Sequence, residues 1–114
     1  MKWFLGRFTY AFQGLKASIK DKSIFLQACF GILVLFFGFL FRCSLQEWIL
    51  LIWSIGLVLF AEIVNSCIEG CVDYISLKKD PRAKKIKDMA AFGVLVISIC
   101  AAFTGLYVFI PKVF

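Results

Sequence analysis

The segment from Ile24 to Phe41 restricts the folds open to this chain more than any other feature. Its 18 residues include a single strongly polar side chain, Gln27. A helix of this length extends about 27 Å, which approaches the hydrocarbon thickness of a bilayer, about 30 Å. The sequence therefore predicts that this segment crosses a membrane as a helix.

Two more membrane spans follow along the chain. The second begins near Trp48, and its first 13 residues carry no charge. Because so short a stretch cannot cross a bilayer, this helix must continue through the acidic residues that come next. The third apolar stretch, residues 89–110, has Ser98 and Thr104 as its small polar side chains, and we expect Pro111 to end it. We thus expect spanning helices within residues 24–41, 48–74 and 82–110.

The overall composition agrees with one membrane-embedded domain over residues 1–114. Hydrophobic residues make up 62% of the chain and its mean hydropathy is +0.93, whereas soluble domains are about 45–50% apolar. Too little polar surface remains to cover a water-soluble core. The expected fold class is an all-α integral membrane protein. Its five cysteines include no CxxC pair, and we interpret them as reduced thiols.

Residues 1–21 are predicted to form an amphipathic helix before the first span. Apolar residues such as Phe4, Phe8 and Phe12 recur at helical spacing, while polar residues such as Gln13 and Lys16 gather on another face. Helices of this kind lie along a membrane surface with their apolar face in the lipid. We therefore expect an N-terminal surface helix.

The basic residues predict the orientation of the spans. Eleven of the 13 Lys and Arg residues precede the first span or separate the second from the third, whereas Arg42 and Lys112 flank the opposite side. The eleven are Lys2, Arg7, Lys16, Lys20, Lys22, Lys78, Lys79, Arg82, Lys84, Lys85 and Lys87. Because cations are enriched in cytoplasmic segments, we expect a cytoplasmic N-terminus and an external C-terminus. This placement accounts for the net charge of +6 without nucleic acid as a partner.

Four oxygen-bearing side chains lie in the second predicted span: Glu62, Asn65, Glu69 and Asp73. Their spacing of three, four and four residues places them within an arc of about 80° on a helix. An acid in the middle of a membrane helix costs about 2.5–3.5 kcal/mol, so this polar stripe must be shielded by protein, water, cations or a ligand. We interpret the stripe as part of a cytoplasm-facing site. The alternative is that it only packs polar groups between helices, with Asp73 in the interfacial zone.

The residue types limit the chemistry of such a site. The chain has no His and no Gly-rich nucleotide loop, which leaves carboxylates as bases or as ligands of Mg²⁺. Glu62 and Glu69 lie about 10 Å apart along a helix, so we expect them to have separate roles. Lys84, Lys85 and Lys87 could hold a polyphosphate, although fixing the topology or contacting anionic lipids would equally explain the first two.

Three stretches of the sequence resemble one known family. They are "EIVNSCIEGCVD" (62–73), "KDMAA" (87–91) and "YAFQGLKAS" (10–18). Together they resemble the prokaryotic diacylglycerol kinases, and the undecaprenol kinase branch in particular. The resemblance implies a homotrimer in the bacterial inner membrane that moves the γ-phosphate of ATP, with Mg²⁺ as cofactor, to a lipid alcohol at the cytoplasmic face.

The resemblance also implies residue roles by position. Glu62 corresponds to the general base, Asn65 to a residue that orients the phosphoryl group, and Glu69 to a metal ligand. The implied nucleotide contacts are Tyr10, Glu69, Asp73, Lys87 and Asp88. The implied partners are ATP, the lipid alcohol, membrane lipids and further copies of the chain.

One position departs from the family pattern. The family carries Glu eight residues after the glycine matched by Gly14, as a second metal ligand, and this chain has Lys22 there. Asp21 could replace that Glu only with a local rotation of the helix, because it lies about 100° away and has a shorter side chain. Ile24 also stands where the family has Asn. The departure implies a rebuilt metal site, reduced activity or lost catalysis, and we favour an active kinase.

Other functions are compatible with the residues. A transporter could carry protons or cations on Glu62 or Glu69, although the other two spans lack matching polar groups for a complete path. A structural or regulatory trimer could have lost catalysis through Lys22. Among kinase substrates, diacylglycerol is the alternative to undecaprenol, which we prefer because "EIVNS" and the "IPKVF" tail resemble that branch.

Overall fold

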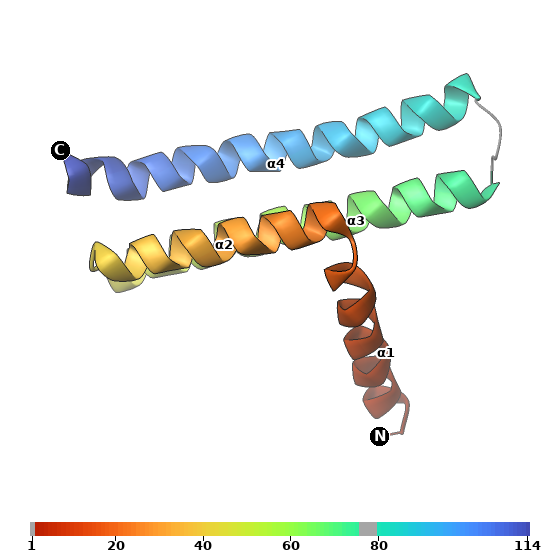
Figure 1. The fold of residues 1–114 in the computed structure, drawn as a ribbon, viewed down its shortest axis with the longest axis horizontal. Coiled ribbons are helices and arrows are strands. Elements are labelled where there is room, and N and C mark those ends of the chain that lie inside the picture. The colour runs from red at the N-terminus through yellow and green to blue at the C-terminus, as the bar shows by residue number, and fades with distance from the viewer. Residues whose placement is uncertain (1, 76–79) are drawn as a thin grey trace.

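The computed structural model describes residues 2–75 and 80–114 and consists of helices joined by short turns (Figure 1). The helices are α1 (Lys2–Ile19), α2 (Lys22–Leu40), α3 (Leu45–Ile75) and α4 (Pro81–Val113). The last three are long and apolar enough to cross a membrane. The prediction of an all-helical fold with three spanning helices is therefore confirmed.

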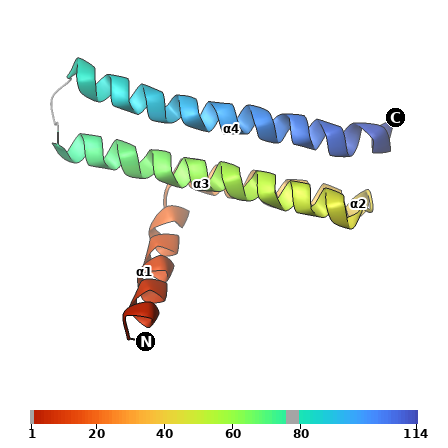
Figure 2. The ribbon, with the colours of Figure 1, turned by 180° about the vertical axis from the view of Figure 1, so that it is seen from behind.

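The three long helices run side by side and alternate in direction, while α1 projects away from them (Figures 1 and 2). We call the end of the bundle where α2 and α4 begin the inner end, after its predicted orientation, and the opposite end the outer end. The 11 cations predicted to be cytoplasmic include Lys78 and Lys79, which lie outside the described residues. The side of the membrane that each end faces stays a prediction.

Side-chain caps fix where two of these helices begin. Asp21 accepts hydrogen bonds from the backbone N–H groups of Ser23 and Ile24, at 2.9 and 3.4 Å, and so caps α2. Asp80 accepts one from the N–H of Arg82 at 2.9 Å, directly before Pro81. A cap at Asp80 is what the sequence "KDPRAKK" favours.

The helix α3 lies at the centre of the bundle and packs against both α2 and α4. Glycines let α2 approach it closely. A Cβ atom added to Gly31 would lie 2.8 Å from Ile55 Cγ2, and one added to Gly38 would lie 3.2 Å from the Trp48 ring. Small residues allow this kind of close approach between membrane helices, where the lipid supplies no hydrophobic drive for packing.

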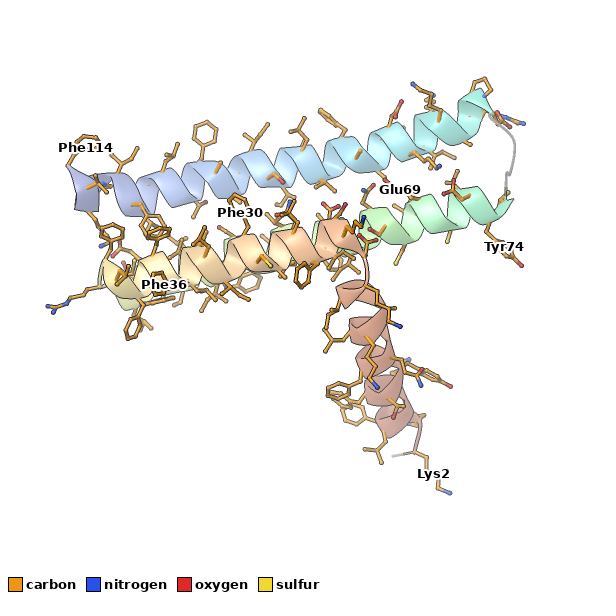
Figure 3. The ribbon with its side chains drawn as sticks, in the orientation of Figure 1. Lys2, Phe30, Phe36, Glu69, Tyr74 and Phe114 are labelled. Atoms are coloured by element: carbon orange, nitrogen blue, oxygen red, sulfur yellow. The ribbon has the colours of Figure 1, made fainter. Side chains whose placement is uncertain are left out.

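Most of the other apolar side chains are exposed in the single chain. Phe30 and Phe36, both on α2, are 61% and 58% exposed (Figure 3). Leu51 and Val108 are among the few that are almost fully buried. A surface this apolar suits contact with lipid tails or with other membrane helices.

The C-terminal end of α4 differs from the sequence prediction. Pro111 does not end the last helix, which continues to Val113. A proline in the final turn removes only one N–H donor, so the helix can continue past it. The N–H of Phe114 still donates to the carbonyl of Ile110 at 3.0 Å.

The segment predicted as a surface helix is helical, with none of its residues buried. Its position on a membrane stays a prediction.

Candidate functional site

Glu62 and Asn65 are the buried polar side chains of the described residues, at 8% and 9% exposure. Both lie on α3, and their distance from its outer end is about equal to the length of α2. The helices α3 and α4, with 31 and 33 residues, extend beyond the 19-residue α2 at the inner end (Figure 1). A helix of 19 residues already spans about 28 Å. The two side chains are thus placed near the inner edge of the apolar layer.

Asn65 connects this buried pair to the next acid of the polar stripe. Its side-chain Nδ2 donates a hydrogen bond to Glu69 Oε1 at 3.1 Å. Its other side-chain atom, Oδ1, is buried and has no hydrogen-bond partner. A buried polar atom without a partner costs about 1–3 kcal/mol, so this oxygen is a candidate for ligand contact.

A third carboxylate approaches from the turn between α1 and α2. This turn lies beside α3 in both views of the chain (Figures 1 and 2). Asp21 lies in this turn as the N-cap of α2. The fold therefore places beside α3 an acid that is about 40 residues from Glu62 in sequence.

The part of the polar stripe nearest the C-terminal end of α3 contacts α4 through an ion pair. Lys87 Nζ pairs with Asp73 Oδ1 across the two helices. Asp88, the neighbour of Lys87 in sequence, pairs instead with Lys84 on its own helix at 3.2 Å. Consecutive helical residues point about 100° apart, which explains why Lys87 and Asp88 have different partners.

An open cleft of about 570 Å³ lies along the start of α4. Its lining combines basic, acidic and apolar side chains, namely Pro81, Lys84, Lys85, Asp88, Met89 and Phe92. Two lysines beside an aromatic ring could contact phosphates and a nucleotide base. The cleft contains one of the predicted nucleotide contacts, Asp88.

Tyr10 is the predicted site residue that the fold leaves apart. It lies midway along α1, which projects away from α3 and α4 (Figure 3), and it is 72% exposed. Its hydroxyl makes no hydrogen bond within residues 2–75 and 80–114. A contact with nucleotide at this position would need a ligand that reaches α1, or α1 from another copy.

The donor set suits a metal ion only in part. In the described part of the chain, no three Asp, Glu, Cys or His side chains converge closely enough to form a complete metal site. Mg²⁺, however, usually takes one or two carboxylates and completes its shell with water and phosphate oxygens. Glu69 and its neighbours therefore fit a shared magnesium–nucleotide site better than a closed protein site.

Comparison with known proteins identifies the family. The family model for prokaryotic diacylglycerol kinase matches residues 9–109. The chain belongs to this family. The predicted enzyme class, a lipid kinase, is confirmed by this membership and by the names of the relatives.

Individual relatives within the prokaryotic diacylglycerol kinase family carry two different names. The undecaprenol kinase of Bacillus subtilis is 34% identical over 110 residues, which cover 96% of this chain and 89% of that protein. The diacylglycerol kinase of Helicobacter pylori is 39% identical over 97 residues, covering 82% and 74%. That of Haemophilus influenzae is 34% identical over 92 residues, covering 80% and 77%.

Sequence reasoning missed two features of the arrangement. The first is the cap formed by Asp21, for which the signal was an Asp followed by Ser23 just before an apolar run. The second is an ion pair at the outer end, where Lys112 Nζ lies 2.9 Å from Glu47 Oε1. The sequence "SLQE" from Ser44 was a recognisable capping box, but nothing in it pointed to Lys112.

Proposed function

We propose that the chain phosphorylates a membrane lipid alcohol with ATP at the cytoplasmic face of the bacterial inner membrane. The observation that carries the proposal is the burial of Glu62 and Asn65 at the inner edge of three apolar helices, in a member of a kinase family. A lipid hydroxyl lies at this depth in a bilayer, while ATP is in the adjacent water. The site is thus at the boundary between the two substrates.

The proposed base is Glu62. Its carboxylate takes the proton of the lipid hydroxyl as the oxygen forms a bond to the γ-phosphorus, and the bond to the β-phosphate oxygen breaks to release ADP. The proton leaves Glu62 for water after product release. Asn65, one turn further along α3, orients the phosphoryl group through its amide.

We assign Mg²⁺ to Glu69 and the nucleotide to the neighbouring charges. The cation would neutralise phosphate charge as the γ-phosphoryl group moves. Lys87, now paired with Asp73, is in place to exchange that partner for phosphate oxygens. Asp73, Asp88 and Tyr10 remain proposed nucleotide contacts.

A homotrimer would explain the residues that face away from Glu62. Asp88 lies on a different face of α4 from Lys87, and Tyr10 lies on the projecting helix. In an oligomer, these side chains can contribute to the site of a neighbouring copy. The mass of the protein–detergent complex, measured by light scattering, tests this proposal, and a monomeric active enzyme would contradict it.

Undecaprenol is our proposed substrate, with undecaprenyl phosphate as the product. Support comes from the alignment with the undecaprenol kinase, which covers 96% of this chain, against 80–82% for the two diacylglycerol kinases above. Diacylglycerol, which would give phosphatidic acid, is the alternative, because all three relatives have similar identity.

The test is transfer of label from [γ-³²P]ATP by the purified protein in detergent micelles. Undecaprenol and dioleoylglycerol are supplied in parallel, with and without Mg²⁺. We expect Mg²⁺-dependent labelling of undecaprenol at the higher kcat/KM. Preferential labelling of dioleoylglycerol would show that diacylglycerol, and not undecaprenol, is the preferred substrate. No labelling of either lipid would contradict the proposed function. A Lys22→Glu variant in the same assay shows whether the departure at this position limits activity.

A further inference from the structure

The helix α1 leaves nearly all of its surface uncovered in the single chain. None of its residues is buried, and it projects away from the three long helices (Figure 3). Its C-terminal end joins α2 at the capping residue Asp21, so this end lies at the inner edge of the apolar layer, where the headgroups of a bilayer begin. Whatever covers α1 at this depth must suit both apolar and charged side chains.

The cations of α1 lie on both sides of its apolar face. That face comprises the exposed residues Phe4, Phe8, Ala11, Phe12, Leu15 and Ile19. At a helical rotation of about 100° per residue, Lys16 lies about 90° to one side of the centre of the face, and Arg7 lies about 90° to the other. When the apolar face of such a helix is in the lipid, both flanks are at the depth of the headgroups. The position of Arg7 away from the lysines therefore places it on the second flank.

Arg7 is held against an aromatic ring on this second flank. Its Cζ lies 5.0 Å from the centroid of the Trp3 ring, which is a cation–π contact. Trp3 contacts Phe4 edge to face, and Phe4 contacts Phe8 in the same way, with ring centroids 6.1 and 4.9 Å apart. The guanidinium presents its face to Trp3, while the N–H groups in its plane can still donate to a phosphate. Tryptophan itself is enriched at the boundary between lipid and water.

The charge of α1 and of its connection to α2 is entirely positive before Asp21. Residues 2–20 contain Lys2, Arg7, Lys16 and Lys20 but no Asp or Glu, and none of these four forms an ion pair within the described residues. Each Lys or Arg near an anionic membrane surface contributes about 1 kcal/mol of attraction. A second copy of this chain, with its net charge of +6, matches these cations less well. Charge complementarity therefore favours anionic lipid as the partner of α1.

We propose that α1 selects anionic lipids, such as phosphatidylglycerol, and that Arg7, held against Trp3, donates to a headgroup phosphate on the flank opposite Lys16. In a zwitterionic lipid, the choline or ethanolamine group already neutralises the phosphate, so the cations of α1 gain less there. The inference goes beyond the predicted surface position of the helix, because it assigns α1 a preference for lipid charge. It does not depend on the proposed kinase reaction.

The experiment measures how well lipid shields Trp3 from acrylamide, a quencher of tryptophan fluorescence that carries no charge. The full chain carries Trp48→Phe and Trp53→Phe, so that Trp3 is its single tryptophan. It is reconstituted in nanodiscs of phosphatidylcholine, either alone or with about one third phosphatidylglycerol. Because the quencher is neutral, the lipid charge does not itself change the access of the quencher to Trp3.

Three variants of this single-tryptophan protein separate the two flanks of α1 from a general effect of charge. Arg7→Gln removes the cation held against Trp3, and Lys16→Gln removes one from the opposite flank. The matched control is Arg42→Gln, which makes the same change as Arg7→Gln between α2 and α3 at the outer end. Each protein is compared with itself in the two lipid mixtures, so a direct effect of Arg7 on Trp3 fluorescence cancels.

We expect phosphatidylglycerol to lower the quenching constant of Trp3 about twofold, and high salt to weaken this effect. Arg7→Gln should lose most of the decrease and Lys16→Gln a part of it, while Arg42→Gln should keep it. Equal quenching of Trp3 in the two lipid mixtures would overturn the inference, and it would indicate that neutral lipid or a second copy covers α1. A decrease as large in Arg7→Gln as in Arg42→Gln would overturn the headgroup contact assigned to Arg7.

Discussion

The two ends of the α3–α4 pair use polar groups in opposite ways. At the outer end, Glu47 accepts hydrogen bonds from the N–H of Ser44 and from Lys112 Nζ, both at 2.9 Å. At the inner end Asp73 pairs with Lys87, but Asp21, Glu62 and Glu69 form no ion pair within the described residues, and Asn65 Oδ1 has no hydrogen-bond partner.

This difference separates a structural role from a chemical one. Polar groups that satisfy one another hold helices in register and leave nothing for a ligand to bind. Polar groups that are gathered and left unpaired lower stability, and they are typical of sites where a substrate or ion supplies the missing partner. We therefore expect the outer end to serve the fold and the inner end to serve the proposed reaction.

The largest expected effect comes from removing the proposed base. Glu62→Gln keeps the size of the side chain but cannot accept a proton at neutral pH, so lipid phosphorylation should fall at least about 100-fold. Glu47→Gln makes the same change at the outer end and should leave kcat unchanged. Labelled lipid from [γ-³²P]ATP measures both, and an active Glu62→Gln protein would remove this residue as the base.

A smaller effect is expected from removing a phosphate-binding cation. Lys87→Met should raise the KM for ATP about tenfold, because one charge-assisted contact is lost, while Lys112→Met should not change it. Steady-state rates over a range of ATP concentrations give both values. An equal KM in the two variants would show that Lys87 has only the structural role of pairing with Asp73.

A substitution that disturbs the close packing near the outer end should lower the stability of the protein without changing its kinase activity. Gly38→Val places atoms against Trp48 and Leu51, which an added Cβ would approach to 3.2 and 3.3 Å. We expect a loss of about 1–2 kcal/mol in the free energy of unfolding. Gly56→Val is the control, since a Cβ there meets nothing within 4 Å. Equal thermal stability of the two variants in micelles would contradict the packing described above.

The smallest effect concerns Cys43, between α2 and α3. Burial, and then the nearby Glu47 carboxylate, raise the pKa of its thiol, while Lys112 acts in the opposite direction. Because the thiolate is the reactive form, Glu47→Gln should speed alkylation by iodoacetamide about two- to threefold at neutral pH. Lys112→Met should slow it. The rates are measured with the other four cysteines replaced by Ala, and effects of the same sign would contradict this electrostatic account.

Helical periodicity was enough to predict much of the inner end. A spacing of three and four residues placed Asn65 and Glu69 on one face of a single helix, and these two side chains are hydrogen bonded. The start of α4 followed from local capping chemistry, in which Asp80 precedes a proline. Both features depend on residues that are close in sequence.

Features that depend on two helices could not be predicted in the same way. The partners Glu47 and Lys112 are 65 residues apart, and the sequence alone does not set the register between α3 and α4. The same limit applies to Asp73, which pairs with Lys87. The roles of all the site residues stay predictions, and Tyr10 in addition lies on α1, which projects away from α3.

The central claim is that chemistry takes place at the inner end, and the position of a bound nucleotide tests it most directly. The measurement is an experimental structure of the protein with Mg²⁺ and a non-hydrolysable ATP analogue. Our account predicts the triphosphate between Glu69 and Lys87, with its terminal phosphate directed toward Glu62 and room for one hydroxyl oxygen between them. A triphosphate bound away from α3, with Glu62 facing lipid tails, would contradict it.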